Sequence, residues 1–204
     1  MQIRYYFSIL LFGLLIAAPK LGATVVSGQI TGGNSLKMGA KFIKLQVPFS
    51  QSRPANTVGQ DTFTQAHLYA FDEDQNITLA KELKVNIAPN SKSRTKNRIA
   101  AGTVVASHYV FFDPAKSLSQ KAKVTFDAKV LGVMTQMKTL RESDILANTS
   151  VKYLNPEARG LEVTDRVKIL DEFTVQVDWK ANSPGDFIRV ITEYSPGATF
   201  LVPD

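Results

Sequence analysis

The dominant pattern along the chain is an alternation of apolar and polar residues. Four segments keep their apolar side chains on one parity, namely residues 43–49, 83–87, 124–130 and 173–179. Because successive side chains of a strand point to opposite faces, each segment predicts a strand with one buried and one solvated face.

Two further segments are apolar on both parities, at residues 104–112 and 187–191. Strands of this kind are covered on both faces, so we expect them in the middle of a sheet. Shorter strands are expected at residues 25–31, 67–71, 77–79 and 166–170, which gives about nine strands in all. Only residues 137–148 have the spacing of a helix.

The segments between these strands are rich in turn-forming residues, such as Gly32-Gly33-Asn34 and Ser183-Pro184-Gly185-Asp186. Many short strands, polar turns and one short helix predict an all-β fold, an antiparallel β-sandwich with a jelly-roll-like arrangement. Residues 24–204 are enough for a single domain with a sizeable core.

The N-terminus predicts export. Arg4 is followed by an apolar run at residues 5–18 and then by Lys20. The run has the length of a secretory signal peptide and is short for a membrane span, so we expect a signal peptide over residues 1–23 and a secreted or periplasmic protein. Cleavage after Ala18 and retention as an N-terminal anchor are the alternatives.

Composition narrows the function classes. The chain has no cysteine, which excludes thiol catalysis and cysteine-bound zinc. The net charge is +6, and loss of Arg4 and Lys20 with the signal peptide would leave +4. This is too small to indicate nucleic-acid binding. A basic stretch at residues 92–98 is expected to be a solvated loop, with contact to an anionic surface as the alternative.

A family resemblance rests on four stretches: residues 58–63 (VGQDTF), 68–76 (LYAFDEDQN), 101–114 (AGTVVASHYVFFDP) and 183–190 (SPGDFIRV). Together they resemble an uncharacterised secreted bacterial domain of surface proteins, some of which carry a PEP-CTERM sorting tail. Such a tail is absent after Arg189, so the resemblance implies a released β-domain. It implies no catalytic residues.

Acidic residues follow two of the apolar strands. Asp72, Asp74 and Asn76 match the first three ligand positions of an EF-hand loop. Ile77 stands where that loop needs glycine, and Leu83 where it needs the closing glutamate, so an EF-hand is excluded.

A calcium site on a β-sandwich takes oxygen ligands from several loops instead. The acids at the expected strand ends would form one if those ends are neighbours. The candidate Ca²⁺ ligands are Asp61, Asp72, Glu73, Asp74 and Asp113. The alternative is that these acids cap turns and solubilise a hairpin.

The sequence gives little support to catalysis. His67 and His108 enter or lie within apolar strands, where a buried, hydrogen-bonded histidine is a commoner outcome than a metal ligand or general base. Ser107 and His108 are adjacent and should point to opposite faces of a strand, so they cannot pair as nucleophile and base. A glycosidase pair of carboxylates stays open, but no pair stands out.

Aromatic residues beside polar groups suggest sugar recognition. Trp179 continues a buried series and is expected in the core, whereas Tyr69, Tyr109 and Tyr194 are open to either interpretation. The candidate ligand-binding residues are Tyr69, His108, Tyr109 and Arg189.

These observations favour an exported, non-enzymatic module that binds glycan or extracellular matrix, with calcium as a candidate stabilising ion. The alternative is a structural protein that self-associates through its exposed sheet edges. A hydrolase is the third possibility.

Overall fold

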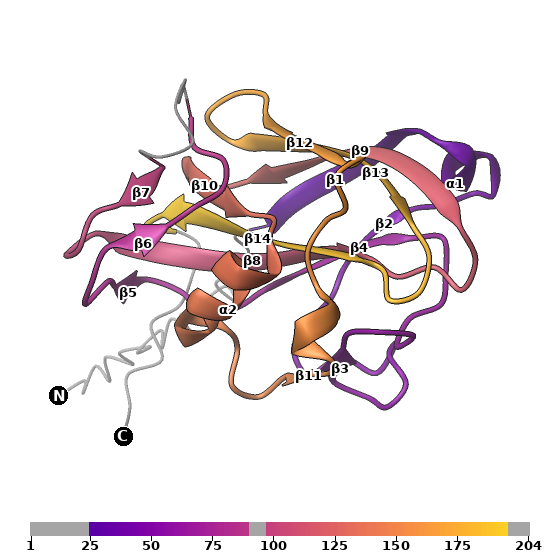
Figure 1. The fold of residues 1–204 in the computed structure, drawn as a ribbon, viewed down its shortest axis with the longest axis horizontal. Coiled ribbons are helices and arrows are strands. Elements are labelled where there is room, and N and C mark those ends of the chain that lie inside the picture. Colours follow the sequence, from indigo (N-terminus) through magenta and orange to yellow (C-terminus); the bar gives the residue numbers. More distant parts are fainter. Residues whose placement is uncertain (1–24, 90–96, 196–204) are drawn as a thin grey trace, which may run out of the picture.

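The computed structural model describes residues 25–89 and 97–195. The expected signal peptide and most of the basic stretch at 92–98 lie outside the described residues. Two mainly antiparallel sheets pack face to face as a β-sandwich (Figure 1). The smaller sheet has the order β1-β9-β13-β12. Its strands are β1 (Val25–Gly32), β9 (Leu118–Phe126), β13 (Thr174–Ala181) and β12 (Arg166–Ile169).

The larger sheet has the order β10-β14-β8-β4-β2, with β5 also paired to β8. All its pairs are antiparallel except β2 with β4, which run parallel. Its strands are β10 (Val130–Met134), β14 (Asp186–Glu193), β8 (Val104–Phe112), β4 (Leu68–Asp72), β2 (Phe42–Lys44) and β5 (Ile77–Thr78).

The inner core lies between the two sheets and is formed by the alternating apolar residues. Val124, Val175, Val177 and Trp179 of the smaller sheet face the larger sheet, and all are buried. The Trp179 ring stacks on Phe112, with ring centroids 6.3 Å apart. The expectation that Trp179 belongs to the core is confirmed.

A second core covers the opposite face of the larger sheet. It is closed by an irregular layer of loops and short elements that lies outside the sandwich (Figure 1). These elements are β3 (Thr57–Val58), β6 (Leu83–Lys84), β7 (Arg98–Ile99), α2 (Met137–Glu142), η2 (Asp144–Leu146), β11 (Lys152–Tyr153) and η3 (Pro156–Ala158). Because both faces of β8 and β14 are covered, their sequences are apolar on both parities, as predicted.

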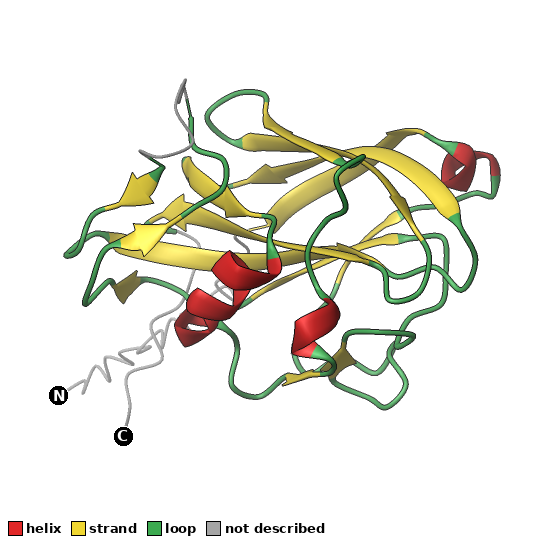
Figure 2. Cartoon of the chain, viewed as in Figure 1, coloured by secondary structure: helices red, strands yellow, loops and turns green. Residues whose placement is uncertain are grey.

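The helices of the described residues are short and lie outside the sheets (Figure 2). The predicted helix at 137–148 is found as α2 followed by the 3-10 helix η2. A further short helix, α1 (Asn34–Lys37), was not predicted. Nowhere in residues 25–89 and 97–195 is there a helix long and apolar enough to cross a membrane.

One predicted strand proves to be two. Residues 124–130 keep their buried parity, since Val124, Phe126, Ala128 and Val130 are all buried. The chain nevertheless leaves the smaller sheet after Phe126 and joins the larger one at Val130. Burial on one parity persists because both strands line the same inner core.

Candidate functional site

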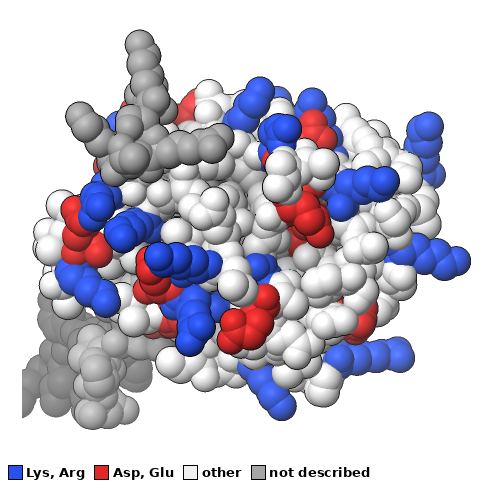
Figure 3. Space-filling model, viewed as in Figure 1, with Lys and Arg blue, Asp and Glu red and all other residues white. Residues whose placement is uncertain are grey.

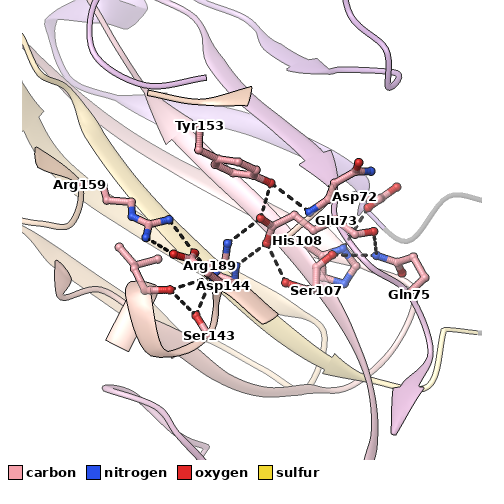
Figure 4. Close-up of polar contacts among 12 residues, drawn as sticks. Asp72, Glu73, Gln75, Ser107, His108, Ser143, Asp144, Tyr153, Arg159 and Arg189 are labelled. Atoms are coloured by element: carbon pink, nitrogen blue, oxygen red, sulfur yellow. Dashed lines mark hydrogen bonds and ion pairs between the residues drawn. The ribbon is translucent and has the colours of Figure 1, made fainter. Parts of the chain in front are cut away.

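A cluster of charged side chains, three buried and one partly exposed, lies between the larger sheet and the irregular layer. We call Glu73, Asp144, Arg159 and Arg189 the charged cluster (Figure 4). At its centre the side chains of Arg189, on β14, and Glu73, just after β4, are fully buried. Arg189 donates two hydrogen bonds to the carboxylate, from Nε to Oε2 at 2.5 Å and from Nη2 to Oε1 at 2.7 Å. Such a bidentate pair fixes both side chains in direction.

Glu73 also accepts hydrogen bonds from neighbouring elements. Ser107 Oγ on β8 donates to Oε2 at 2.7 Å, and Tyr153 OH on β11 donates to Oε1 at 2.6 Å. A carboxylate can accept about four hydrogen bonds. The four donors from Arg189, Ser107 and Tyr153 therefore satisfy it without any external ligand.

The other side of Arg189 holds the irregular layer in place. Its Nη1 donates to Leu140 O, Ser143 Oγ and Asp144 Oδ1 at 3.0, 2.7 and 3.1 Å. Asp144 in turn accepts from Arg159, from Nη1 to Oδ1 at 2.8 Å and from Nη2 to Oδ2 at 2.5 Å. Two cations and two anions thus balance within the charged cluster.

The electrostatics of the charged cluster favour its charged form. Burial opposes the charge on Arg189, but the Glu73 carboxylate outweighs burial and raises the pKa of the guanidinium. Burial, together with the charge of Glu73, raises the pKa of Tyr153, and burial also raises that of Tyr109. Both phenols are thus hydroxyl donors rather than phenolates at neutral pH.

A shallow depression opens beside the charged cluster. Its floor contains Tyr109, Tyr153 and Phe187, and its polar rim contains Gln60 and Asn155. Further lining comes from Val58, Gly59, Leu154, Ala158 and Arg159. It spans about 210 Å³, open solvent included, without enclosed space for a water molecule. The depression therefore suits a contact made from outside rather than an engulfed ligand.

The rim of the depression is pre-arranged by hydrogen bonds. Asn155 Nδ2 donates to Gln60 Oε1 at 3.0 Å, and Gln60 Nε2 donates to Ser183 Oγ at 3.1 Å. Gly59 has a φ of 138° and lies against the Leu154 carbonyl, where any side chain would collide. Three loops distant in sequence are thereby held together at this rim.

A second polar group joins the two sheets at Asp72, the last residue of β4. Asp72 Oδ2 pairs with Lys44 Nζ at 2.8 Å, and its Oδ1 lies 3.0 Å from His108 Nδ1 and accepts from the Val25 amide at 3.0 Å. Burial would raise the pKa of Asp72, but His108 and Lys44 together outweigh burial and lower it. Asp72 is therefore a carboxylate at neutral pH.

Asp113, at the end of β8, binds the loop that precedes β4. Its buried carboxylate accepts from the amides of Asp61, Thr62 and Phe63 at 3.2, 2.8 and 3.1 Å. Asp61 has a φ of 59°, a left-handed conformation that aspartate tolerates better than most residues. Burial raises the pKa of Asp113 to about 6, and the three amides oppose that rise.

A third acidic group, Glu162, Asp165 and Asp186, is called here the acidic triad. One carboxylate oxygen from each residue lies within 4.8 Å of the others. Asp165 accepts from the Glu162 and Lys180 amides at 2.9 and 3.0 Å. Burial, followed by repulsion from Asp165 and Glu162, raises the pKa of Asp186 to about 9. The acidic triad connects the start of β14 to the loop before β12.

The five acids expected to bind calcium do not meet at one point. Glu73 is saturated by Arg189, Ser107 and Tyr153; Asp72 binds Lys44 and His108; and Asp113 binds backbone amides. Asp61 is exposed, and Asp74 is half-buried with a pKa raised by burial and by Glu73. Within the described residues, the acidic triad is the one group of three or more potential ligands that lie close enough for a shared ion.

All four candidate ligand-binding residues are buried. Tyr69 and Tyr109 are 1% and 2% exposed, and His108 and Arg189 are fully buried. No side-chain face of these four is open for stacking on a sugar, so the expected exposed platform is corrected. His108 is a core histidine, and its Nε2 forms a hydrogen bond with Thr192 Oγ1 at 3.0 Å. Tyr194, at 45% exposed, is the candidate aromatic that stays at the surface.

Sequence reasoning missed Asp144, Arg159 and the acidic triad. Asp144 lies in the segment predicted as a plain helix, and Arg159 follows a left-handed turn at Asn155. The acidic triad joins residues 162–165 to Asp186. In the sequence these are two acids in the loop before β12 and one at the start of β14, and nothing in the local pattern reveals their proximity.

Surface charge gives no indication of a polyanion partner on the face shown in Figure 3, where lysines and arginines are spread out with acids among them. No protein-family model matches the chain, and searches of curated proteins and of solved structures found no match to it.

Proposed function

We propose that this protein is an exported, non-enzymatic module that binds a polysaccharide or other extracellular-matrix glycan at the depression beside the charged cluster. The observation that carries the proposal is the composition of the depression. The partly exposed ring of Tyr153 lines it, together with the buried rings of Tyr109 and Phe187, and two side-chain amides stand at its rim. Sugar sites combine apolar ring faces with a few fixed polar groups in this way.

The charged cluster supports the proposal by holding the depression rigid. Arg159 lines the depression and is tied through Asp144 to Arg189, on the sheet beneath it. A pre-organised surface loses less entropy on binding, which is how a shallow contact gains useful affinity. The shallow form also favours a sugar unit of a longer chain over a small enclosed metabolite.

Export is part of the proposal and rests on the apolar run at residues 5–18 together with the absence of cysteine. An extracellular polysaccharide would be accessible only to an exported protein. Intact-mass measurement of the exported material tests this part, and a mass that includes Met1 would contradict it.

Binding to a panel of immobilised polysaccharides tests the ligand class. Asn155→Gly removes the rim amide while permitting the left-handed backbone at Asn155, whose φ is 47°. We expect affinity for the selected glycan to fall about 10-fold, since one lost hydrogen bond to a ligand costs about 1.4 kcal/mol.

Gln46→Ala is the matched control, because Gln46 is an exposed amide outside the depression. It should bind as the unaltered protein does. Equal loss in both variants, or no glycan bound at all, would contradict the proposal.

A further inference from the structure

The acidic triad gathers three acids without a counter-charge. Glu73, Asp72 and Asp144 each pair with a lysine, an arginine or a histidine. Within residues 25–89 and 97–195, by contrast, no basic nitrogen comes within 4.0 Å of Glu162, Asp165 or Asp186. Three carboxyl groups are thus gathered with no basic nitrogen of the described residues within that distance.

Asp186 provides a second observation, which does not depend on the clustering of the three acids. Its side chain is 1% exposed, its Oδ2 is buried with no nitrogen or hydroxyl donor, and its carboxyl group interacts with that of Glu162, a second acid. The same side chain points at the carboxylates of Glu162 and Asp165. A buried carboxylate oxygen without a donor is costly, and proteins normally satisfy such groups with a donor or a metal ion.

We propose that Glu162, Asp165 and Asp186 bind a divalent cation, with calcium as the ion that fits. Calcium prefers oxygen ligands at 2.3–2.6 Å, so ligands on opposite sides of the ion lie up to about 5 Å apart. The 4.8 Å limit on the separations within the acidic triad agrees with this spacing. Three carboxylates supply three to six of the six to eight oxygens that calcium takes, and water would supply the rest.

The location gives the ion a mechanical role. Glu162 and Asp165 belong to the loop that runs from Arg159, at the depression, to β12, whereas Asp186 begins β14. A shared ion would tie this loop to the larger sheet, whereas the hydrogen bond from the Lys180 amide to Asp165 ties it to β13 of the smaller sheet. The cation site is independent of the proposed glycan binding, since neither Glu162, Asp165 nor Asp186 lines the depression.

Thermal unfolding of the purified protein with added CaCl₂ or EDTA tests the site. An ion bound only by the folded state raises Tm by mass action. For a dissociation constant of about 0.1–1 mM, typical of extracellular calcium modules, about 10 mM CaCl₂ should raise Tm by about 3–10 °C over EDTA. Isothermal titration with CaCl₂ should show one site per chain.

Two variants and a control decide the assignment. Asp186→Asn should abolish the Tm rise while its Tm in EDTA stays equal to or above that of the unaltered protein, because the amide can donate to its two acidic neighbours. Glu162→Gln alters an exposed residue and should weaken calcium binding several-fold without changing Tm in EDTA. Glu157→Gln, an acid with a side chain 69% exposed on η3, should respond as the unaltered protein does.

Several results would overturn the proposal. A Tm unaffected by CaCl₂, or a calcium response that survives Asp186→Asn, would show that no ion binds here and that Asp186 is simply protonated. A response to MgCl₂ as large as that to CaCl₂ would overturn the assignment to calcium, because magnesium needs ligands at 2.0–2.1 Å.

Discussion

Arg189 shows at the scale of one residue how this protein manages buried charge. Every nitrogen of its guanidinium has an acceptor, and the ring of Tyr109 lies 5.6 Å from its central carbon. Taking such a charge out of water costs several kcal/mol, which only a well-shaped partner can offset. Removal of the partner alone should therefore destabilise the fold more than replacement of both residues by well-packed apolar side chains would.

Replacement of that partner gives the first residue-scale prediction. Glu73→Gln keeps the shape of the side chain but leaves Arg189 without its main anion, so we expect a loss of about 3–5 kcal/mol in the free energy of unfolding. Urea denaturation measures it. Glu82→Gln removes a surface partner of Arg98 and should cost no more than about 1 kcal/mol. Similar losses in the two variants would show that the charged cluster is not held together as described.

The second prediction concerns pH. The pKa of Asp72 is lower in the folded chain than the usual value near 4, so the unfolded chain binds the proton more readily. The stability that Asp72 contributes is therefore complete above about pH 4 and is lost as the pH falls below it.

Asp72→Asn should accordingly destabilise the protein by about 1–3 kcal/mol at pH 7. The difference from the unaltered protein should shrink between about pH 4 and pH 2, as denaturation at several pH values would reveal. A difference that stays constant over this range would mean that Asp72 is not held ionised by Lys44 and His108.

Individual residues were predictable only where the local pattern decides their surroundings. His108 and Trp179 were expected in the core because each shares a parity with apolar neighbours in its own strand. The partner of Glu73 could not be inferred, since Arg189 lies 116 residues further along the chain. A run of acids looks the same whether it will hold calcium, cap a turn or meet a buried arginine.

At the scale of elements, the paired strands β8 and β14 contribute residues to both cores. They pair over eight residues, from Asp186 opposite Phe112 to Glu193 opposite Val105. One face of this pair supports the inner core and the other supports the charged cluster and the depression. The two cores therefore share a backbone, and a disturbance in one reaches the other.

The alternating strands were predictable because burial on one face leaves a period of two in the sequence. The residues at which these strands begin and end were less predictable. Phe173 shares the parity of Val175 yet is 44% exposed, because β13 begins only at Thr174. The parallel pairing of β2 with β4 joins segments that are distant in the sequence, so no local pattern predicts it.

The inner face of β13 gives the element-scale prediction. Val177→Asp would place an unpaired charge against the larger sheet, at a cost comparable with the whole stability of a domain, so we expect an unfolded protein. Lys123→Gln, on the solvated face of the neighbouring strand β9, should change stability by no more than about 0.5 kcal/mol. Circular dichroism and urea denaturation distinguish the two, and a folded Val177→Asp protein would refute the described inner core.

At the scale of the whole molecule, the exposed strand edges decide whether the sheets pair with other copies of this protein. An unprotected edge strand is a template for such pairing. The outermost strands are protected in different ways: β1 is interrupted by register shifts, β2 has three residues, and β12 carries Arg166 and Lys168. The β10 edge is partly covered, since Val133 exchanges backbone hydrogen bonds with Ile87.

These protected edges predict a monomer, which favours the binding module over the self-associating structural protein. Sedimentation should show a single species from micromolar to near-millimolar concentrations. Lys168→Val removes a charge from the β12 edge and should induce concentration-dependent association, because charged side chains on an edge discourage pairing. Lys123→Val adds the same side chain to β9, which has neighbours on both sides, and should stay monomeric. If the unaltered protein itself formed oligomers without ligand, its sheets would be assembly surfaces and the self-associating alternative would be the better description.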